Sequence, residues 1–301
     1  MKQATRIWLI VAAVLIVIGG FMFVGAMSLA KWNFGIFSNA SYVTSTVDVD
    51  RPFKSIAIES NVQDIVFEPS TDGTCKVVFI DRAERECSAV VVNDTLTIKV
   101  VDKGGFDFGL DTSPYDPMIT VKLPLASYAA LSIQEDTGDI TLPAGYSFEN
   151  IGLRADTGDI RVDGVNAGRI DVSVTSGHVE MRSVACKGDL AVNVTTGKVL
   201  LSGVTCANLN TKGDTGDVKL ENVLAAGTIN VTRDTGDVRF EHSDAAGLQV
   251  RTDTGEVSGS LRTEKIFVTQ TDTGDVRVPK TTSGGTCSIT TNTGDISITI
   301  G

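Results

Sequence analysis

The stretch "EDTGDITL" at residues 135–142 returns along the chain with small changes, as "ADTGDIRV" at 155–162 and "GDTGDVKL" at 213–220. Every copy, including looser variants, carries a glycine at the same place. These turn glycines are Gly138, Gly158, Gly177, Gly197, Gly216, Gly236, Gly255, Gly274 and Gly294. Neighbouring members are 19 or 20 residues apart. Such a regular period predicts a solenoid, in which each repeat folds as one coil stacked on the next.

Apolar and polar residues alternate on both sides of each turn. Around Gly138 the apolar residues are Leu131, Ile133, Ile140 and Leu142, at offsets −7, −5, +2 and +4 from the glycine. Period-two alternation rich in Val, Ile and Thr predicts half-buried strands. We therefore predict an all-β, single-stranded β-solenoid of about nine coils of about 20 residues. A β-sandwich with hairpin connections is the alternative fold.

The repeated D-T-G-D motif has both a structural and a functional interpretation. Glycine supplies a positive φ at little cost, and the preceding Asp could accept a backbone N–H two residues on, in an Asx-type turn. The alternative is a rail of metal ligands formed by the residue after each glycine. Its members would be Asp139, Asp159, Asp217, Asp237, Glu256, Asp275 and Asp295.

Two residues in the rail favour the structural interpretation. Calcium is bound by six to eight oxygens at ~2.3–2.6 Å. His178 and Lys198 occupy the rail position in two adjacent coils, which a continuous metal rail would not tolerate. We therefore predict structural corners, with no metal site and no cofactor.

The N-terminal region contains a long apolar stretch. Residues 7–30 lack any charge and are flanked by Lys2, Arg6 and Lys31. At ~1.5 Å per residue such a helix could cross a hydrocarbon layer of ~30 Å. We predict a single uncleaved transmembrane helix with a cytoplasmic N-terminus and an extracytoplasmic remainder, because basic residues precede the stretch. A signal peptide cleaved after Ser28-Leu29-Ala30 is the alternative.

The predicted organisation has four parts. Residues 1–31 form the cytoplasmic start and anchor, 32–50 a linker, 51–125 a degenerate β cap layer, and 126–301 the repeat solenoid. Within the cap, "ESNVQDIVF" loosely imitates the repeat turn, and Asn93-Asp94 predicts a tight hairpin.

Charge and residue content limit the function. Residues 32–301 carry 23 basic against 37 acidic side chains, a formal charge of −14, which repels nucleic acid and anionic lipid headgroups. With two histidines, His178 and His242, and no nucleophile fixed beside either, we predict no catalytic residues and no enzyme. Cys186 and Cys206 occupy equivalent places in neighbouring coils, and we favour two buried thiols over a disulfide.

These segments resemble a bacterial, membrane-anchored family of unknown function whose members are called "putative adhesin" and consist of repeated T-S/T-G-D β units. The resemblance rests on "RIWLIVAAVLIVIG" at 6–19, "SIAIESNVQDIVFEPSTDGTCKVV" at 55–78, "DTLTIKVVD" at 94–102 and the repeats. It implies an exported β-solenoid on a Gram-positive-type cell surface, in relatives often associated with envelope stress. It supplies no catalytic or binding residues.

The predicted function is a non-enzymatic, membrane-tethered interaction scaffold that contacts a cell-envelope polymer or protein. The alternatives are a polysaccharide-processing β-helix enzyme and a calcium-binding component of an envelope-stress sensor. The chain stops at "DISITIG", residues 295–301, directly after a predicted strand. Because exposed strand edges invite pairing, we also predict self-association through this C-terminal strand.

Overall fold

The computed structural model describes residues 12, 15–25, 28, 42–83, 85–102 and 116–301. These belong to two units, one of residues 1–42 and 104–115 and one of residues 43–103 and 116–301, called here the β unit. In the first unit, residues 15–25 are helical. Within the described part of the chain, no helix is both long and apolar enough to cross a membrane. The predicted anchor over residues 7–30 lies only partly within the described residues.

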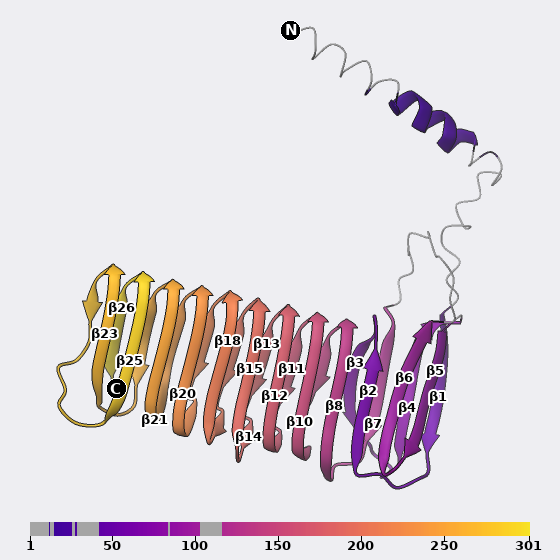
Figure 1. Ribbon diagram of the computed structural model, residues 1–301. Coiled ribbons are helices and arrows are strands. Elements are labelled where there is room, and N and C mark those ends of the chain that lie inside the picture. The colour runs from indigo at the N-terminus through magenta and orange to yellow at the C-terminus, as the bar shows by residue number, and fades with distance from the viewer. Residues whose placement is uncertain (1–11, 13–14, 26–27, 29–41, 84, 103–115) are drawn as a thin grey trace. The chain divides into compact units, whose positions relative to one another are not determined.

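The β unit consists of two sheets, which we call sheet A and sheet B (Figure 1). In spatial order, sheet A contains β1 (Tyr42–Val49), β4 (Cys75–Arg82), β7 (Met118–Leu123), β3 (Asp64–Pro69), β9 (Ile140–Leu142), β11 (Ile160–Asp163), β13 (Val179–Arg182), β16 (Val199–Ser202), β19 (Val218–Glu221), the first part of β21 (Val238–Thr254), β22 (Val257–Leu261), β26 (Ile296–Ile300) and β24 (Val276–Arg277). Sheet B contains β5 (Arg85–Val92), β6 (Thr95–Asp102), β2 (Ser55–Ser60), β8 (Ser127–Thr137), β10 (Ser147–Thr157), β12 (Asn166–Ser176), β14 (Ala185–Cys186) with β15 (Asp189–Thr196), β17 (Thr205–Cys206) with β18 (Asn208–Thr215), β20 (Leu224–Thr235), the second part of β21, β25 (Gly285–Thr293) and β23 (Lys265–Thr273).

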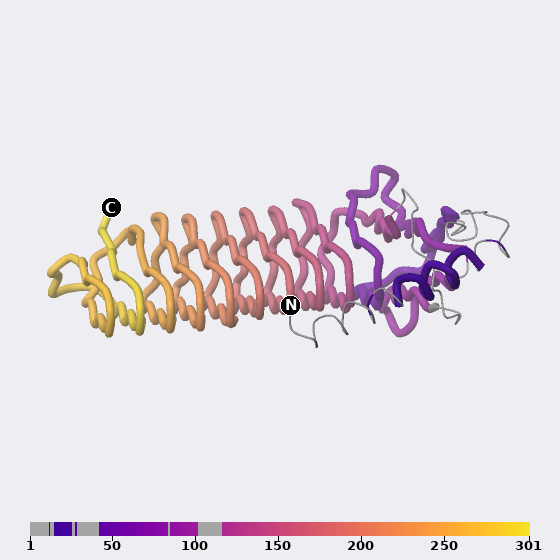
Figure 2. Tube along the Cα trace, turned by 90° about the horizontal axis from the view of Figure 1, so that it is seen from above, coloured from indigo at the N-terminus to yellow at the C-terminus, as the bar shows by residue number. Residues whose placement is uncertain are grey.

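Successive coils stack in parallel register, which confirms the predicted all-β solenoid. In sheet B, Leu131 pairs with Ile151, and Ile151 with Ile170; in sheet A, Ile140 pairs with Ile160. Figure 2 shows the coils following one another along the rod. The chain crosses between the sheets at two corners: the glycine corner, at the turn glycines, and the far corner on the opposite side.

The core lies between the sheets, where the predicted offsets point inward. Leu131, Ile133, Ile140 and Leu142 are each at most 1% exposed. The same positions in the other coils hold mainly Val, Ile and Leu, so the interior is a stack of aliphatic layers. Burying each such side chain stabilises the fold by about 1.5–3 kcal/mol, before the entropy of ordering the chain is subtracted.

The turn glycines adopt a backbone conformation that other residues rarely adopt. All nine have φ between +129° and +159°. Each also lies against the backbone of the adjacent coil: a Cβ built on Gly158 would lie 2.0 Å from the carbonyl oxygen of Gly138. The motif therefore requires glycine for two reasons: the positive φ, and the lack of room for a Cβ beside the backbone of the neighbouring coil.

Further strands precede the first glycine-containing coil. β2 and β3 stack in parallel on β8 and β9, and β6 and β7 stack beyond them. Two antiparallel pairs follow, β5 with β6 and β4 with β7. The predicted hairpin is confirmed: Asn93 and Asp94 have φ of 50° and 59°, as a type I′ turn requires.

The C-terminal end departs from sequence order. β25 lies between β21 and β23, and β26 pairs with β22 on one side and with β24 at Ile296 and Ser297 on the other. The last segment is thus inserted one layer inside the rod, and the outermost coil is β23 and β24 (Figure 1). The prediction that the final strand forms the open edge is therefore wrong, because sequence order does not fix stacking order.

Candidate functional site

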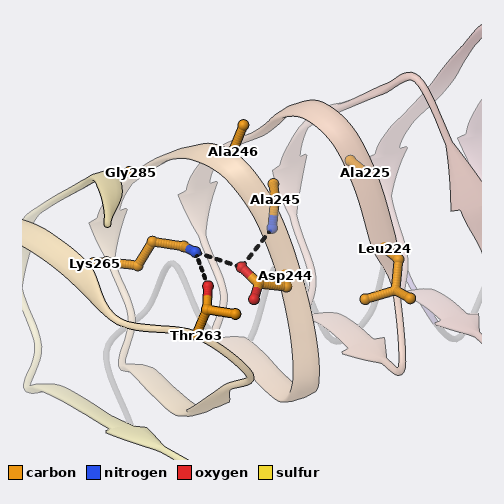
Figure 3. A pocket seen from close by; sticks show the side chains of 8 residues that line it. All are labelled: Leu224, Ala225, Asp244, Ala245, Ala246, Thr263, Lys265 and Gly285. Atoms are coloured by element: carbon orange, nitrogen blue, oxygen red, sulfur yellow. Dashed lines mark hydrogen bonds and ion pairs between the residues drawn. The ribbon is translucent and has the colours of Figure 1, made fainter. Parts of the chain in front are cut away.

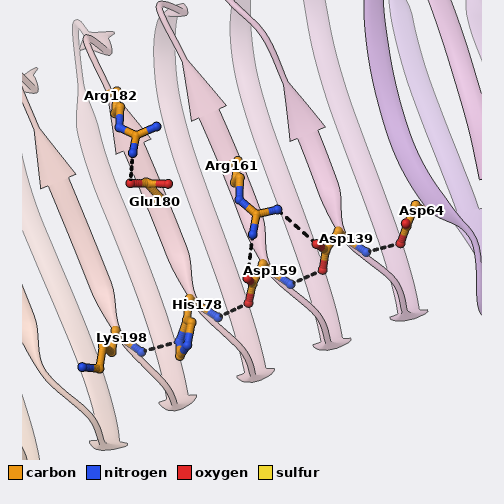
Figure 4. A network of polar contacts seen from close by, with 8 residues as sticks. All are labelled: Asp64, Asp139, Asp159, Arg161, His178, Glu180, Arg182 and Lys198. Atoms are coloured by element: carbon orange, nitrogen blue, oxygen red, sulfur yellow. Dashed lines mark hydrogen bonds and ion pairs between the residues drawn. The ribbon is translucent and has the colours of Figure 1, made fainter.

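The residue after each turn glycine links neighbouring coils through its side chain. The amide of Asp159 donates to Oδ1 of Asp139 at 2.8 Å, and the amide of Asp139 donates to Oδ1 of Asp64 at 2.8 Å (Figure 4). The amide of Glu256 makes the equivalent bond to Asp237, also at 2.8 Å. The proposed rail is thus a ladder in which each acceptor binds the backbone of the next coil.

His178 and Lys198 show what this ladder position needs. The His178 amide donates to Oδ1 of Asp159 at 2.9 Å, and Nδ1 of His178 in turn accepts the Lys198 amide at 3.0 Å. Lys198 has no acceptor to offer, and its Nζ instead lies 3.2 Å from Oδ2 of Asp217. An imidazole can therefore replace the carboxylate in the ladder, and the ladder is interrupted at Lys198.

Some ladder carboxylates also form ion pairs through their second oxygen, Oδ2. Arg161 lies between two coils, with Nη1 3.0 Å from Oδ2 of Asp139 and Nη2 2.8 Å from Oδ2 of Asp159. Such half-exposed ion pairs contribute little stability, typically ~0.2–1 kcal/mol. Within the described residues, no group of three or more His, Cys, Asp or Glu side chains has metal-binding geometry.

The predicted Asx turn is absent. The amide of every turn glycine except Gly274 donates to a neighbouring coil instead; for example, Gly158 donates to the carbonyl of Ser176 at 3.0 Å. Among the described residues the first Asp of the motif accepts no backbone hydrogen bond at the corner, and only Asp253 is in an ion pair, with Arg251. These residues form an acidic row, which Thr175, Thr195 and Asn292 interrupt. It comprises Asp136, Asp156, Asp214, Asp234, Asp253 and Asp272, all exposed except the half-buried Asp253.

A pocket of about 350 Å³ opens at the far corner near the C-terminal end. The chain passes directly from β22 to β23 and skips a layer, so the inserted coil has no far corner of its own (Figure 3). Lys265 reaches into this gap and places Nζ 2.5 Å from Oδ1 of Asp244. Its ammonium also donates to the hydroxyl of Thr263 at 2.5 Å.

A larger groove, of about 860 Å³, lies at the far corner near β8 and β10. Its floor contains Tyr128 and Phe148, whose ring centroids are 5.6 Å apart, and Lys54 and Lys187 lie on its rim. Both aromatic side chains are at least 92% buried, so they stabilise the corner and offer little surface to a ligand.

A buried acid lies where the repeat coils meet the preceding layers. Glu135 is 3% exposed, and burial raises its pKa from the usual 4.5 to about 7. The hydroxyl of Ser60 and nearby amides oppose this shift only partly. The Ser60 hydroxyl donates to Oε1 of Gln63, and neither carboxylate oxygen of Glu135 has a well-formed hydrogen bond among the described residues.

We expect Glu135 to make stability depend on pH. Below about pH 4.5 the Glu135 carboxyl is neutral in both the folded and the unfolded state, so it does not lower the free energy of unfolding. Between about pH 4.5 and 7 the carboxyl ionises in the unfolded chain but stays neutral in the folded one, so stability falls as pH rises. Glu135→Gln should therefore stabilise the protein relative to wild type more at pH 8 than at pH 4.5, with a difference on the order of 2 kcal/mol. Urea unfolding at both pH values measures this. The exposed Glu149→Gln is the matched control, and an equal effect of both variants would contradict the assignment.

Sequence reasoning missed three buried charged residues in the repeat coils. Glu135 and Arg233 both lie three residues before a turn glycine, an inward offset held by Val174 and Val194 in other coils. Arg233 extends across Gly213 and donates to the carbonyl of Val194 at 2.8 Å. Burial lowers its pKa to about 10. The signal available in the sequence for Glu135 and Arg233 was a charged residue at an inward offset. For Lys265 the signal was a charged residue where other coils have small residues at the far corner.

The cysteines form no disulfide, and the two histidines lie at different corners. All five cysteines are free, and the prediction of two buried thiols at Cys186 and Cys206 is confirmed. Burial raises the pKa of Cys206 to about 12, so its thiol is a poor nucleophile. His178 lies at the glycine corner and His242 at the far corner.

These features define a β-solenoid repeat protein, with an internal ladder and an exposed acidic row along one corner. The family model named Toastrack DUF4097 matches residues 53–299, and the chain therefore belongs to the Toastrack DUF4097 family. The recognised resemblance is thereby confirmed. No curated protein matches the chain.

The chain is similar to several solved structures. A "putative adhesin" from Bacteroides fragilis NCTC 9343 is 13% identical with a TM-score of 0.45, over 86% of this chain and 99% of that one. A "putative lipid binding protein" from Parabacteroides distasonis ATCC 8503 is 14% identical with a TM-score of 0.49, over 87% and 98%. A "putative cell adhesion protein" from Clostridium sporogenes ATCC 15579 is 12% identical with a TM-score of 0.32, over 86% and 99%.

Proposed function

We propose that this protein is a non-enzymatic interaction scaffold, tethered to the membrane by its N-terminal segment and facing the outside of the cell. Its partner is a polymer or protein of the cell envelope. The observation that carries the proposal is the acidic row. Six of the nine coils carry Asp at the first position of the motif, and in five of these the fold gives its carboxylate no hydrogen bond or ion pair among the described residues.

The geometry supports this role in two ways. Neighbouring coils are in register, so members of the row in adjacent coils repeat at about one strand spacing, ~4.8 Å. Such spacing allows several weak contacts to add up when a polymer or extended chain lies along the rod. The cationic groups of a partner suit the row, because the solenoid and its linker carry a formal charge of −14 over residues 32–301.

The tether is supported by the N-terminal segment. Residues 7–30 contain no charged side chain. Leu15, Ile16 and Phe21 in the described helix are 62–76% exposed, as suits contact with lipid. Protease treatment of intact and lysed cells tests this orientation: the β unit should be cleaved in intact cells, and protection there would contradict it.

Co-sedimentation of the full chain with purified envelope polymer, with and without calcium, tests the scaffold. A variant carrying Asp156→Asn, Asp214→Asn, Asp234→Asn and Asp272→Asn should lose binding at least tenfold. The control removes the same charge elsewhere, through Glu68→Gln, Asp94→Asn, Glu149→Gln and Glu264→Gln. Equal loss in both variants would contradict a role for the row, and release of soluble sugars from the polymer would contradict a non-enzymatic scaffold.

A further inference from the structure

The outermost coil leaves an open edge. Among the described residues, no strand pairs with the outer side of β23 or β24, so unpaired N–H and C=O groups line that side. Such an edge is a template for another strand. The core is also incompletely covered there: Val276 lies at an inward position, in register with Ile296, yet is 43% exposed.

The outer coil is apolar where the inner coils are polar. Ile266 and Val268 lie on the solvent face of sheet B and are 44% and 57% exposed. Their register partners in β25 are Thr286 and Ser288, and Ser288 in turn pairs with Gln249. Natural edge strands usually carry lysine or proline to prevent pairing. Among the sheet B strands of the repeat coils, only this outermost strand has exposed large apolar side chains, which indicates that it is covered.

Charge favours contact at this end between two copies of the chain. Residues 32–301 carry a formal charge of −14, so two rods repel when they lie side by side. Along β23, β24 and their turn, Lys265 and Arg277 balance Asp272 and Asp275. End-to-end contact here therefore brings together strands that carry no net formal charge, unlike side-by-side contact of the acidic rods.

We propose that the open end binds a second copy of this chain, tail to tail. Two identical ends related by a twofold axis can pair β23 with β23 in antiparallel fashion, since a twofold axis reverses strand direction. The same operation brings the two β24 strands together, so both sheets are matched at once. At the other end the outermost strands are β1 and β5. There β4 pairs with β7, and β5 with β6, both in antiparallel fashion. The contact therefore closes as a dimer and does not propagate into a filament.

Sedimentation velocity of the full chain in mild detergent, from 1 to 100 µM, tests the dimer. We expect a concentration-dependent dimer that Ile266→Lys with Val268→Lys shifts to monomer, by at least a tenfold increase in the dissociation constant. The matched control is Val90→Lys with Val92→Lys, since Val90 and Val92 are 52% and 54% exposed on edge strand β5 at the opposite end. Unchanged thermal unfolding of each variant verifies that the rod remains folded.

The arrangement of the two copies in the dimer can be tested by measuring distances between spin labels. Spin labels on Lys280→Cys, near the open end, should give an intermolecular distance that double electron–electron resonance can measure. Labels on Asn93→Cys, at the opposite end, should be too far apart to give one. A monomer at 100 µM, dissociation by the β5 control pair, or an intermolecular distance between Asn93 labels would each overturn the proposal. None of these outcomes bears on whether the acidic row binds envelope polymer.

Discussion

Gly197→Ala is expected to lower the free energy of unfolding by about 4 kcal/mol, combining backbone strain and overpacking. Gly197 lies in the middle of the rod with a φ of 141°. A Cβ added there would lie 1.8 Å from the carbonyl oxygen of Gly177. That oxygen belongs to the backbone of a packed coil, so it cannot move aside without separating the two coils. Urea unfolding followed by circular dichroism measures the loss.

The same chain provides a matched control in Gly152. Gly152 has no positive φ, and a Cβ added to it would meet no atom within 4 Å. Gly152→Ala should therefore be neutral, or stabilising by up to ~1 kcal/mol through the unfolded state. Equal destabilisation by the two substitutions would contradict the assigned role of the turn glycines.

The shape of the transition carries further information. In a stacked repeat protein each coil contacts only its neighbours, and cooperativity passes through the interfaces between coils. Weakening one interface in the middle should uncouple the two halves of the rod. We therefore expect the unfolding curve of Gly197→Ala to broaden or to split into two steps, whereas that of Gly152→Ala keeps a single step.

Much of the fold is predictable because the repeat encodes it many times. The glycine spacing sets the coil length, and the alternation around Gly138 identifies the strands and their inward faces. Stacking order could not be predicted, since every coil offers the same hydrogen-bonding edges and register partners. Nothing in residues 265–301 shows that the last coil lies inside the preceding one.

The corner was predicted in part. Its structural role followed from glycine chemistry, but the Asx turn was wrong, because the stacked coil supplies the partner that a local turn would otherwise need. The ladder at Asp139 and Asp159 depends on contacts between residues 20 positions apart in sequence, as does the gap filled by Lys265. Such contacts become visible only after the coils are stacked.

Asp244→Asn is expected to destabilise the C-terminal coils by about 3 kcal/mol, because it leaves the buried ammonium of Lys265 without its counterion. Lys265 is 3% exposed, and its Nζ lies 2.5 Å from Asp244. It fills the gap that the missing far corner leaves. Hydrogen exchange should show faster exchange over residues 257–300 and unchanged protection over residues 138–216, because the loss is confined to one end of the rod.

A double substitution separates the charge from the packing. Asp244→Asn combined with Lys265→Met removes both charges and keeps a long side chain in the gap, so most of the lost protection should return. The matched control is Asp275→Asn, which breaks the exposed pair with Arg277 on the same coil and should cost less than about 1 kcal/mol. If Asp244→Asn left the terminal coils fully protected, or if the double variant exchanged faster than the single one, the pair would not hold the outer coil in place. The outermost coil would then be held to the rod by strand pairing alone. In that case β23 could pair with β23 of a second copy without the ion pair between Lys265 and Asp244.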